Sequence, residues 1–153
     1  MKRILVLTIL LLVSFLSVCH AFEEPKNARW NNVIKEVDLG VWADMETIEF
    51  ARKTNRYLPC YNHRIVTVWM LIHDTTIKDF DFQKTLEVWD LDCKTVKDIA
   101  TCTFDEKGNR IDYHDTSFNS PRHIVPDTIG EVLLKNLVKI WNSHSKNNIK
   151  EYN

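Results

Sequence analysis

The alternation of apolar and polar positions along this chain predicts a protein built mainly of β-strands. Residues 63–74, HRIVTVWMLIHD, are rich in β-branched and aromatic side chains and almost continuously apolar, which predicts a central strand covered on both faces. Residues 82–93 alternate apolar with charged side chains and predict a second strand. Residues 99–105 and 110–118 predict two more, joined by the turn EKGN, in which Gly108 supplies a positive φ.

The segment before these strands is less regular. Its apolar residues from Trp30 onward fit either a helical turn or an irregular strand. The alternation from Val37 onward favours a strand, with Gly40 at a turn or bulge. The polar stretch ARKTNR, residues 51–56, predicts a loop.

One amphipathic helix is predicted near the C-terminus. Thr128 and Glu131 have the spacing of a capping box, and the two prolines in residues 119–126 indicate a loop before it. We expect the helix to end near Asn142 and residues 143–153 to form a flexible polar tail. Apolar residues three and four apart make up its predicted buried side: Ile129, Val132, Leu133, Leu137, Ile140 and Trp141.

These elements predict an α+β fold in residues 22–142, an antiparallel sheet of about six strands with the C-terminal amphipathic helix packed on one face. The helix must bury its apolar side, and the sheet is the only large surface available to it. At about 25 cal/mol per Å² of apolar area, docking several Leu, Ile and Val side chains should dominate the stability of the domain.

Residues 1–21 have the layout of a secretory signal peptide. A basic start precedes an apolar run of about 15 residues, shorter than the roughly 20 that a membrane span needs. We expect cleavage near Ala21 and an extracytoplasmic location in the periplasm, on the cell surface or outside the cell. The sequence LSVC resembles a bacterial lipobox, so lipidation at Cys19 is an alternative; it ranks lower because Val18 stands where such boxes prefer Gly, Ala or Ser.

Removal of residues 1–21 leaves 132 residues, enough for one domain. The formal net charge changes from -1 to -3 because Lys2 and Arg3 are lost. No polybasic run remains, which argues against nucleic acid and anionic membranes as partners. No later apolar run is long enough to cross a bilayer, so no integral span is expected after the signal is removed.

Four features in this order resemble the surface-adhesin protein E family of bacterial secreted proteins and lipoproteins. They are the strand VTVWM, the pair Asp92-Cys93, the turn Phe104-Asp105 with Gly108, and the helix start from Pro126 to Leu133. The resemblance covers about residues 28–141 and implies a six-stranded antiparallel sheet with a C-terminal helix. It also implies binding of host extracellular-matrix proteins, as for the family's named member, and no common catalytic activity.

The cysteines depart from the family pattern. The resemblance implies a disulfide from Cys93 to a cysteine in the helix, and residues 128–141 contain none. In an oxidising compartment two of Cys60, Cys93 and Cys102 are expected to pair. A two-residue turn at residues 97–98 would place Cys93 opposite Cys102 in a hairpin, a bridge contributing about 3 kcal/mol. We rank this pair first because it assumes no tertiary topology; Cys60–Cys93 and Cys60–Cys102 stay open.

The sequence favours neither a metal site nor catalysis. Cys60 and His63 have the C-x2-H spacing of zinc ligands, but no second closely spaced ligand pair exists. The favoured interpretation is a structural disulfide with surface histidines, and no metal or cofactor. Residues 113–115, YHD, lie in a strand, where the histidine faces away from its two neighbours, and no nucleophile elbow, HExxH or phosphate loop is present. Cys93, Cys102, His73 and His114 could complete a set of metal ligands with Cys60 and His63.

The predicted function is therefore non-enzymatic binding in the cell envelope or outside it, adhesin-like, with a protein partner or another copy through an edge strand. Tyr57, in the polar stretch KTNRYLP, is the candidate contact residue, whereas Trp69 and Trp89 are predicted to lie in the core. The alternative is a small-ligand carrier with a pocket between helix and sheet. A hydrolase without a recognised motif ranks third.

Overall fold

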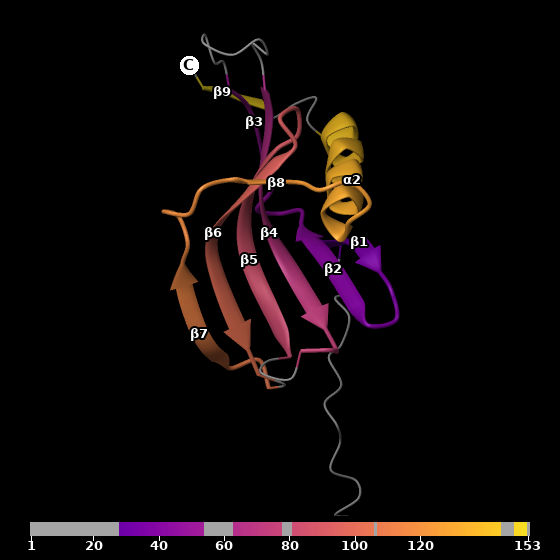
Figure 1. Ribbon diagram of the computed structural model, residues 1–153, viewed down its shortest axis with the longest axis vertical. Coiled ribbons are helices and arrows are strands. Elements are labelled where there is room, and N and C mark those ends of the chain that lie inside the picture. Colours follow the sequence, from indigo (N-terminus) through magenta and orange to yellow (C-terminus); the bar gives the residue numbers. More distant parts are fainter. Residues whose placement is uncertain (1–27, 54–62, 78–80, 106, 145–148, 153) are drawn as a thin grey trace, which may run out of the picture.

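A single sheet dominates the computed structural model, which describes residues 28–53, 63–77, 81–105, 107–144 and the backbone of 149–152. Within these ranges nine strands join in the order β1-β2-β4-β5-β6-β7, with β3 on β4, β9 on β3 and β8 on β6 (Figure 1). All pairs are antiparallel except the parallel pair β3–β9. The strands are β1 (Trp30–Lys35), β2 (Leu39–Asp44), β3 (Glu49–Lys53), β4 (His63–Asp74), β5 (Phe82–Asp90), β6 (Thr95–Phe104), β7 (Arg110–Asp115), β8 (Arg122–His123) and β9 (Ile149–Tyr152).

Strand β4 organises the sheet because it is long enough to carry two partners along one edge. Its first half pairs with β3, as in Glu49 opposite Thr67, and its second half pairs with β2, as in Ala43 opposite Met70. Strand β5 runs along its other edge. The bounds of β4 match the strand predicted at residues 63–74, since an uninterrupted run of strand-forming residues defines it locally.

The two faces of the sheet differ in burial, which corrects the prediction that β4 is covered on both sides. Val66, Val68 and Met70 point to one face and are completely buried, whereas Trp69 between them points to the other face and is half-buried. Trp89 lies in the core, as predicted, and Trp69 does not. The buried face packs against the single helix among the described residues, α2 (Ile129–His144).

Helix α2 confirms the predicted C-terminal amphipathic helix and its docking on the sheet. Its buried side chains are Leu134, Leu137, Ile140 and Trp141. The indole of Trp141 meets the ring of Phe50 edge-on at 5.4 Å between centroids, which fixes the end of the helix against β3. Figure 1 shows α2 beside β1, β2 and β4 and away from β7. Because the helix begins at the edge of the sheet, the predicted buried residues Ile129 and Val132 are in fact 48% and 45% exposed.

The start of α2 differs in detail from the predicted capping box. The Glu131 carboxylate accepts a hydrogen bond from the backbone amide of Asp127 at 2.9 Å instead of that of Thr128. The Thr128 hydroxyl donates to the carbonyl of Val125 at 2.7 Å. Asp127 has a positive φ of 57°, so the chain turns sharply into the helix one residue earlier than the motif requires.

Three regions of the chain carry more regular structure than the sequence predicted. Residues 51–53, expected in a loop, form the end of β3, and β8 adds a short pairing to β6. The predicted tail from residue 143 begins with the last residues of α2 and includes β9. The sheet therefore exceeds six strands because segments with weak local signals pair with strands that already have a free edge.

Candidate functional site

A pocket lies between α2 and the end of the sheet where β5 turns into β6. It has a volume of about 540 Å³. We call it the helix–sheet pocket. Half of its lining residues are apolar, and we call them the floor: Leu91, Ile124, Pro126, Leu134 and Val138. The other half are charged, and we call them the rim: Arg64, Lys94, Glu131, Lys135 and Lys139.

Backbone bonds hold the walls of the helix–sheet pocket together. The carbonyl of Lys94, in the β5–β6 turn, accepts a hydrogen bond from the amide of Ile124 at 2.9 Å. The amide of Leu91 donates to the carbonyl of Arg64 at 2.9 Å. Since Leu91 and Leu134 are also buried in the core, at 4% and 6% exposure, the pocket is built on fixed elements rather than on a loop alone.

The rim of the helix–sheet pocket has an excess of positive charge. Arg64 is held by a forked ion pair with Asp92, with Nη2 to Oδ1 at 2.7 Å. Lys135 pairs with Glu131 at 2.9 Å, and this ion pair, with the Asp127 amide, holds the pKa of Glu131 below its ordinary value. Within the described part of the chain, Lys94 and Lys139 have no carboxylate at ion-pair distance. Lys139 donates to the side-chain oxygen of Asn136 at 3.2 Å, a neutral partner, so these two ammonium groups of the lining keep their positive charge uncompensated by an ion pair.

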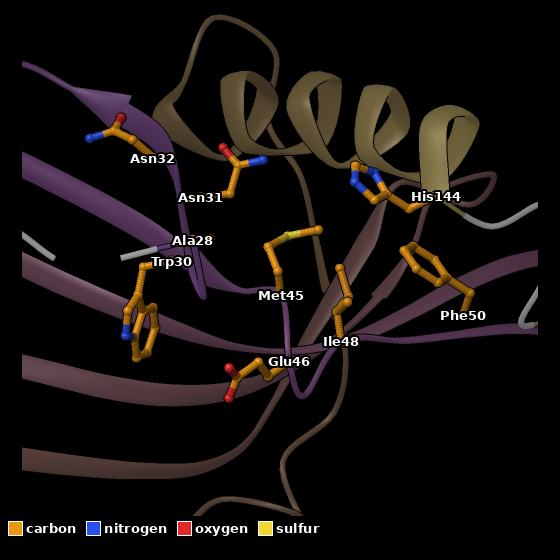
Figure 2. Close-up of a pocket in the computed structure, with 9 residues that line it drawn as sticks. All are labelled: Ala28, Trp30, Asn31, Asn32, Met45, Glu46, Ile48, Phe50 and His144. Atoms are coloured by element: carbon orange, nitrogen blue, oxygen red, sulfur yellow. The ribbon is translucent and has the colours of Figure 1, made fainter. Parts of the chain in front are cut away.

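A second hollow of about 550 Å³ lies below the C-terminal end of α2 (Figure 2). Met45, Ile48 and Phe50 project toward it from the β2–β3 region, with His144 of α2 above the phenylalanine ring. Figure 2 shows Trp30 pointing away from this group, so the aromatic and thioether side chains do not form one apolar wall. Its lining also includes Ala28, Asn31, Asn32 and Glu46, and it is more polar than the helix–sheet pocket.

An ion pair between Arg29 and Asp44 lies next to two lining residues of the hollow, Trp30 and Glu46. Asp44 is 1% exposed and receives the Arg29 guanidinium at 2.6 Å, together with the amide of Glu46 at 3.1 Å. Burial opposes ionisation of Asp44, but these two donors, together with the side chain of Thr47, outweigh it and hold the pKa of Asp44 below its ordinary value. The guanidinium of Arg29 also lies 5.6 Å from the ring of Trp30. These contacts tie the residue that precedes β1 to the last residue of β2.

The structure brings His63, Asp90 and Cys93 together on the face of the sheet away from α2. His63 is the first residue of β4, Asp90 the last of β5, and Cys93 stands in the following turn. Nδ1 of His63 lies 2.8 Å from Oδ2 of Asp90 and 3.2 Å from Sγ of Cys93. We call these residues the His63 cluster. His63 was expected at the surface and is 4% exposed, so that expectation was wrong.

The predicted disulfide hairpin is wrong. Residues 97–98 lie inside β6, and the turn falls at residues 91–94 because Asp90 pairs with Thr95. Cys93 is therefore in the turn and Cys102 near the far end of β6, opposite Lys84 and Tyr113. Cys102 stands seven positions after Thr95 along β6, about 23 Å at 3.3 Å per residue, so the two sulfurs cannot bond. The alternatives with Cys60 involve a residue outside the described ranges and stay predictions.

The other predicted site residues do not converge. Tyr57, the candidate contact residue, and Cys19 also lie outside the described ranges. His114 is exposed and pairs with Asp112 at 3.0 Å, on the far strand β7. Of the ligands weighed from sequence, only His63 and Cys93 meet among the described residues. Asp90, their third companion, had no local signal, because only the pairing of β4 with β5 places it there.

Glu87 is a buried carboxylate that the sequence did not single out. It lies in β5 on the helix side of the sheet, opposite Val68, and is 8% exposed. Burial raises its pKa to about 7, against a hydrogen bond from the Trp89 indole N–H, 2.7 Å from Oε2, which lowers it. The nearby Asp98 raises the pKa further, and Arg122 lowers it.

The edge strand β7 is exposed along its whole length. Ile111 and Tyr113 are 55% and 50% exposed. The amide of Thr116 points to β6, where it bonds to Ile99, so by alternation the amide of Tyr113 points outward. That amide donates instead to the carboxylate of its neighbour Asp112 at 2.7 Å. The outward hydrogen-bonding group is therefore occupied within the chain, a feature that protects sheet edges from pairing.

Comparison with protein-family models, with curated proteins and with solved structures gives no match to this chain. The described part of the chain contains no helix with the length and hydrophobicity that a membrane crossing requires.

Proposed function

We propose that this chain is a non-enzymatic binding domain of an extracytoplasmic compartment, which holds a small amphiphilic anion in the helix–sheet pocket. The observation that carries this proposal is the combination of an apolar floor and a cationic rim in one pocket. Compartment and secretion rest on the signal-like residues 1–21, which lie outside the described ranges.

The size of the pocket favours a small-molecule ligand over a protein partner. A volume of about 540 Å³ falls within the range of roughly 300–1,000 Å³ that is typical of small-molecule sites. An alkyl chain on the floor would gain about 25 cal/mol per Å² of apolar surface removed from water. The residues around the floor are already packed in the core, so little side-chain ordering opposes binding.

The charge of the rim selects the head group. Lys94 and Lys139 line the pocket without a carboxylate at ion-pair distance among the described residues, while Lys135 and Arg64 already have one. A lysine ammonium on a flexible stem attracts a carboxylate or phosphate as a point charge, without imposing a planar geometry. The preferred ligand is therefore an alkyl chain that ends in an anion.

A second candidate is protein binding, and the observation that favours it is the exposed strand β7 with Ile111 and Tyr113. Phe118, which follows it, is 82% exposed. The contact between Asp112 and the outward amide of Tyr113 weakens this edge as a template for strand addition, and it ranks second for that reason. An adhesin-like role, as in the family that the sequence resembles, would use this surface.

The test is calorimetric titration of the purified protein with dodecanoate, dodecanol and dodecyltrimethylammonium below their micelle concentrations. We expect dodecanoate to bind about tenfold tighter than dodecanol, and the cation to bind weakest. The double variant Lys94→Glu/Lys139→Glu should remove the preference for dodecanoate. The matched control Lys53→Glu/Lys107→Glu makes the same charge change at exposed sites elsewhere and should retain the preference.

A third variant tests the floor. Val138→Asp places a charge on it and should weaken both dodecanoate and dodecanol, with the circular dichroism spectrum unchanged. Equal affinities for the three amphiphiles, or equal losses in the two lysine double variants, would contradict the proposal.

A further inference from the structure

We propose that the His63 cluster is a metal-binding site for a divalent ion of the zinc class, with Nδ1 of His63, Oδ2 of Asp90 and Sγ of Cys93 as its protein ligands. Imidazole, carboxylate and thiolate are the donors that Zn²⁺ takes in proteins. The donor atoms of the three residues lie within 4.8 Å of one another. This inference is independent of the helix–sheet pocket, which lies on the other side of the sheet.

The geometry fits an ion better than a catalytic relay. A cysteine–histidine–aspartate relay needs the thiol on one ring nitrogen and the carboxylate on the other. Here both Oδ2 of Asp90 and Sγ of Cys93 face the same nitrogen, Nδ1, at 2.8 and 3.2 Å. Tetrahedral coordination with bonds of about 2.0–2.3 Å separates neighbouring donors by about 3.3–3.6 Å. The two separations from Nδ1 therefore reach this spacing if each lengthens by a few tenths of an ångström.

The carboxylate is held in the direction that coordination requires. Oδ1 of Asp90 accepts hydrogen bonds from the amides of Asp92 at 3.1 Å and Cys93 at 2.8 Å, which leaves Oδ2 to face His63. The turn itself is anchored by Asp92, whose carboxylate accepts the amide of Arg64 at 2.7 Å. Such supporting hydrogen bonds orient ligands in metal sites and maintain their affinity.

His63 is the most buried member of the cluster, with a side chain that is 5% exposed. Among the described residues its Nε2 has no hydrogen-bond partner. Nε2 lies on the opposite side of the ring from Asp90 and Cys93, so a metal on Nδ1 would keep the proton on Nε2 and would not supply that partner. The proposal therefore rests on the three donor atoms that meet at Nδ1.

The experiment is titration of the purified chain, freed of metal by a chelator, with Co²⁺ as a spectroscopic probe and Zn²⁺ in competition. We expect one Co²⁺ per chain, with a near-ultraviolet thiolate-to-cobalt band that Zn²⁺ abolishes. Cys93→Ser should remove the band, and Asp90→Asn, which keeps the oxygen that caps the turn, should weaken binding by at least about tenfold. Cys102→Ser and His114→Ala are matched controls, because they remove a cysteine and a histidine outside the cluster and should bind as the parent does.

Thiol labelling gives a readout that does not depend on the cobalt absorption spectrum. Zn²⁺ should slow alkylation of Cys93 at least about tenfold and leave Cys102 unaffected, since a coordinated thiolate is a poorer nucleophile. Absence of Co²⁺ binding at micromolar concentration would overturn the proposal. So would disulfide mapping that finds Cys93 bonded to another cysteine in the natively produced protein, or a cobalt band that survives in Cys93→Ser.

Discussion

Replacing Glu87 by glutamine should make the protein more stable above neutral pH, and the gain should disappear in acid. The pKa of Glu87 rises from 4.5 to about 7 because its carboxylate is buried beside Val68 and Trp89. Between these two pH values the folded state holds a proton that the unfolded state has released. The free energy of unfolding therefore falls as pH rises from 4.5 to about 7, and stays lower above that.

The magnitude follows from the same two values. A difference between 4.5 and about 7 corresponds to about 3 kcal/mol of stability that the charged carboxylate removes at pH 8. Glutamine has the shape of the protonated acid and keeps an oxygen to accept the indole N–H of Trp89. We expect Glu87→Gln to raise the free energy of unfolding at pH 8 by about 2 kcal/mol, since local relaxation reduces the full effect, and by nearly nothing at pH 4.5.

The assay is urea unfolding at pH 4.5, 5.5, 6.5, 7.5 and 8.5, followed by tryptophan fluorescence and circular dichroism. Glu46→Gln is the matched control, because it removes a carboxylate that is 66% exposed and so reports the effect of one lost negative charge. A difference between Glu87→Gln and the parent that is the same at every pH would refute the argument. So would a loss of stability in Glu87→Gln at pH 8.5, which would mean that the ionised form makes a favourable contact in the fold.

Two further predictions concern Gly40 and the β7 edge. A Cβ at Gly40 would clash with the buried ring of Trp42, so Gly40→Ala should lower the free energy of unfolding by about 1–3 kcal/mol in denaturant titrations. Gly130→Ala, in α2, meets its nearest atoms at 3.4 Å and should not be destabilising. Equal effects of the two substitutions would contradict the steric argument. Asp112→Ala frees the outward amide of Tyr113 and should promote self-association, measured by sedimentation velocity. Lys107→Ala is the control and should leave the sedimentation coefficient unchanged. An unaltered sedimentation coefficient in Asp112→Ala would show that the carboxylate does not prevent pairing at this edge.

The candidate sites show where sequence reasoning stops. The cluster joins Asp90 and Cys93 to His63, which stands 27 and 30 positions earlier in the chain. Only the register of β4 against β5 decides that Asp90 lies beside His63 rather than facing solvent. The cysteine hairpin failed for the same reason. The turn at residues 97–98 was chosen from local spacing, but β5 and β6 continue to pair up to Asp90 and Thr95.

The sequence by itself determined the elements whose signals are local. Strand β4 is a continuous run of strand formers, α2 has apolar residues at helical spacing, and the turn at Gly108 needs its φ of 78°; all three were predicted. The tertiary structure decided what depends on a partner surface. It buried Val68 and left Trp69 half-exposed, because α2 covers only one face of the sheet. It also made strands of β3 and β9, because β4 offers an unpaired edge to β3, and β3 offers one to β9. Backbone groups that would otherwise bond to water form inter-strand hydrogen bonds there.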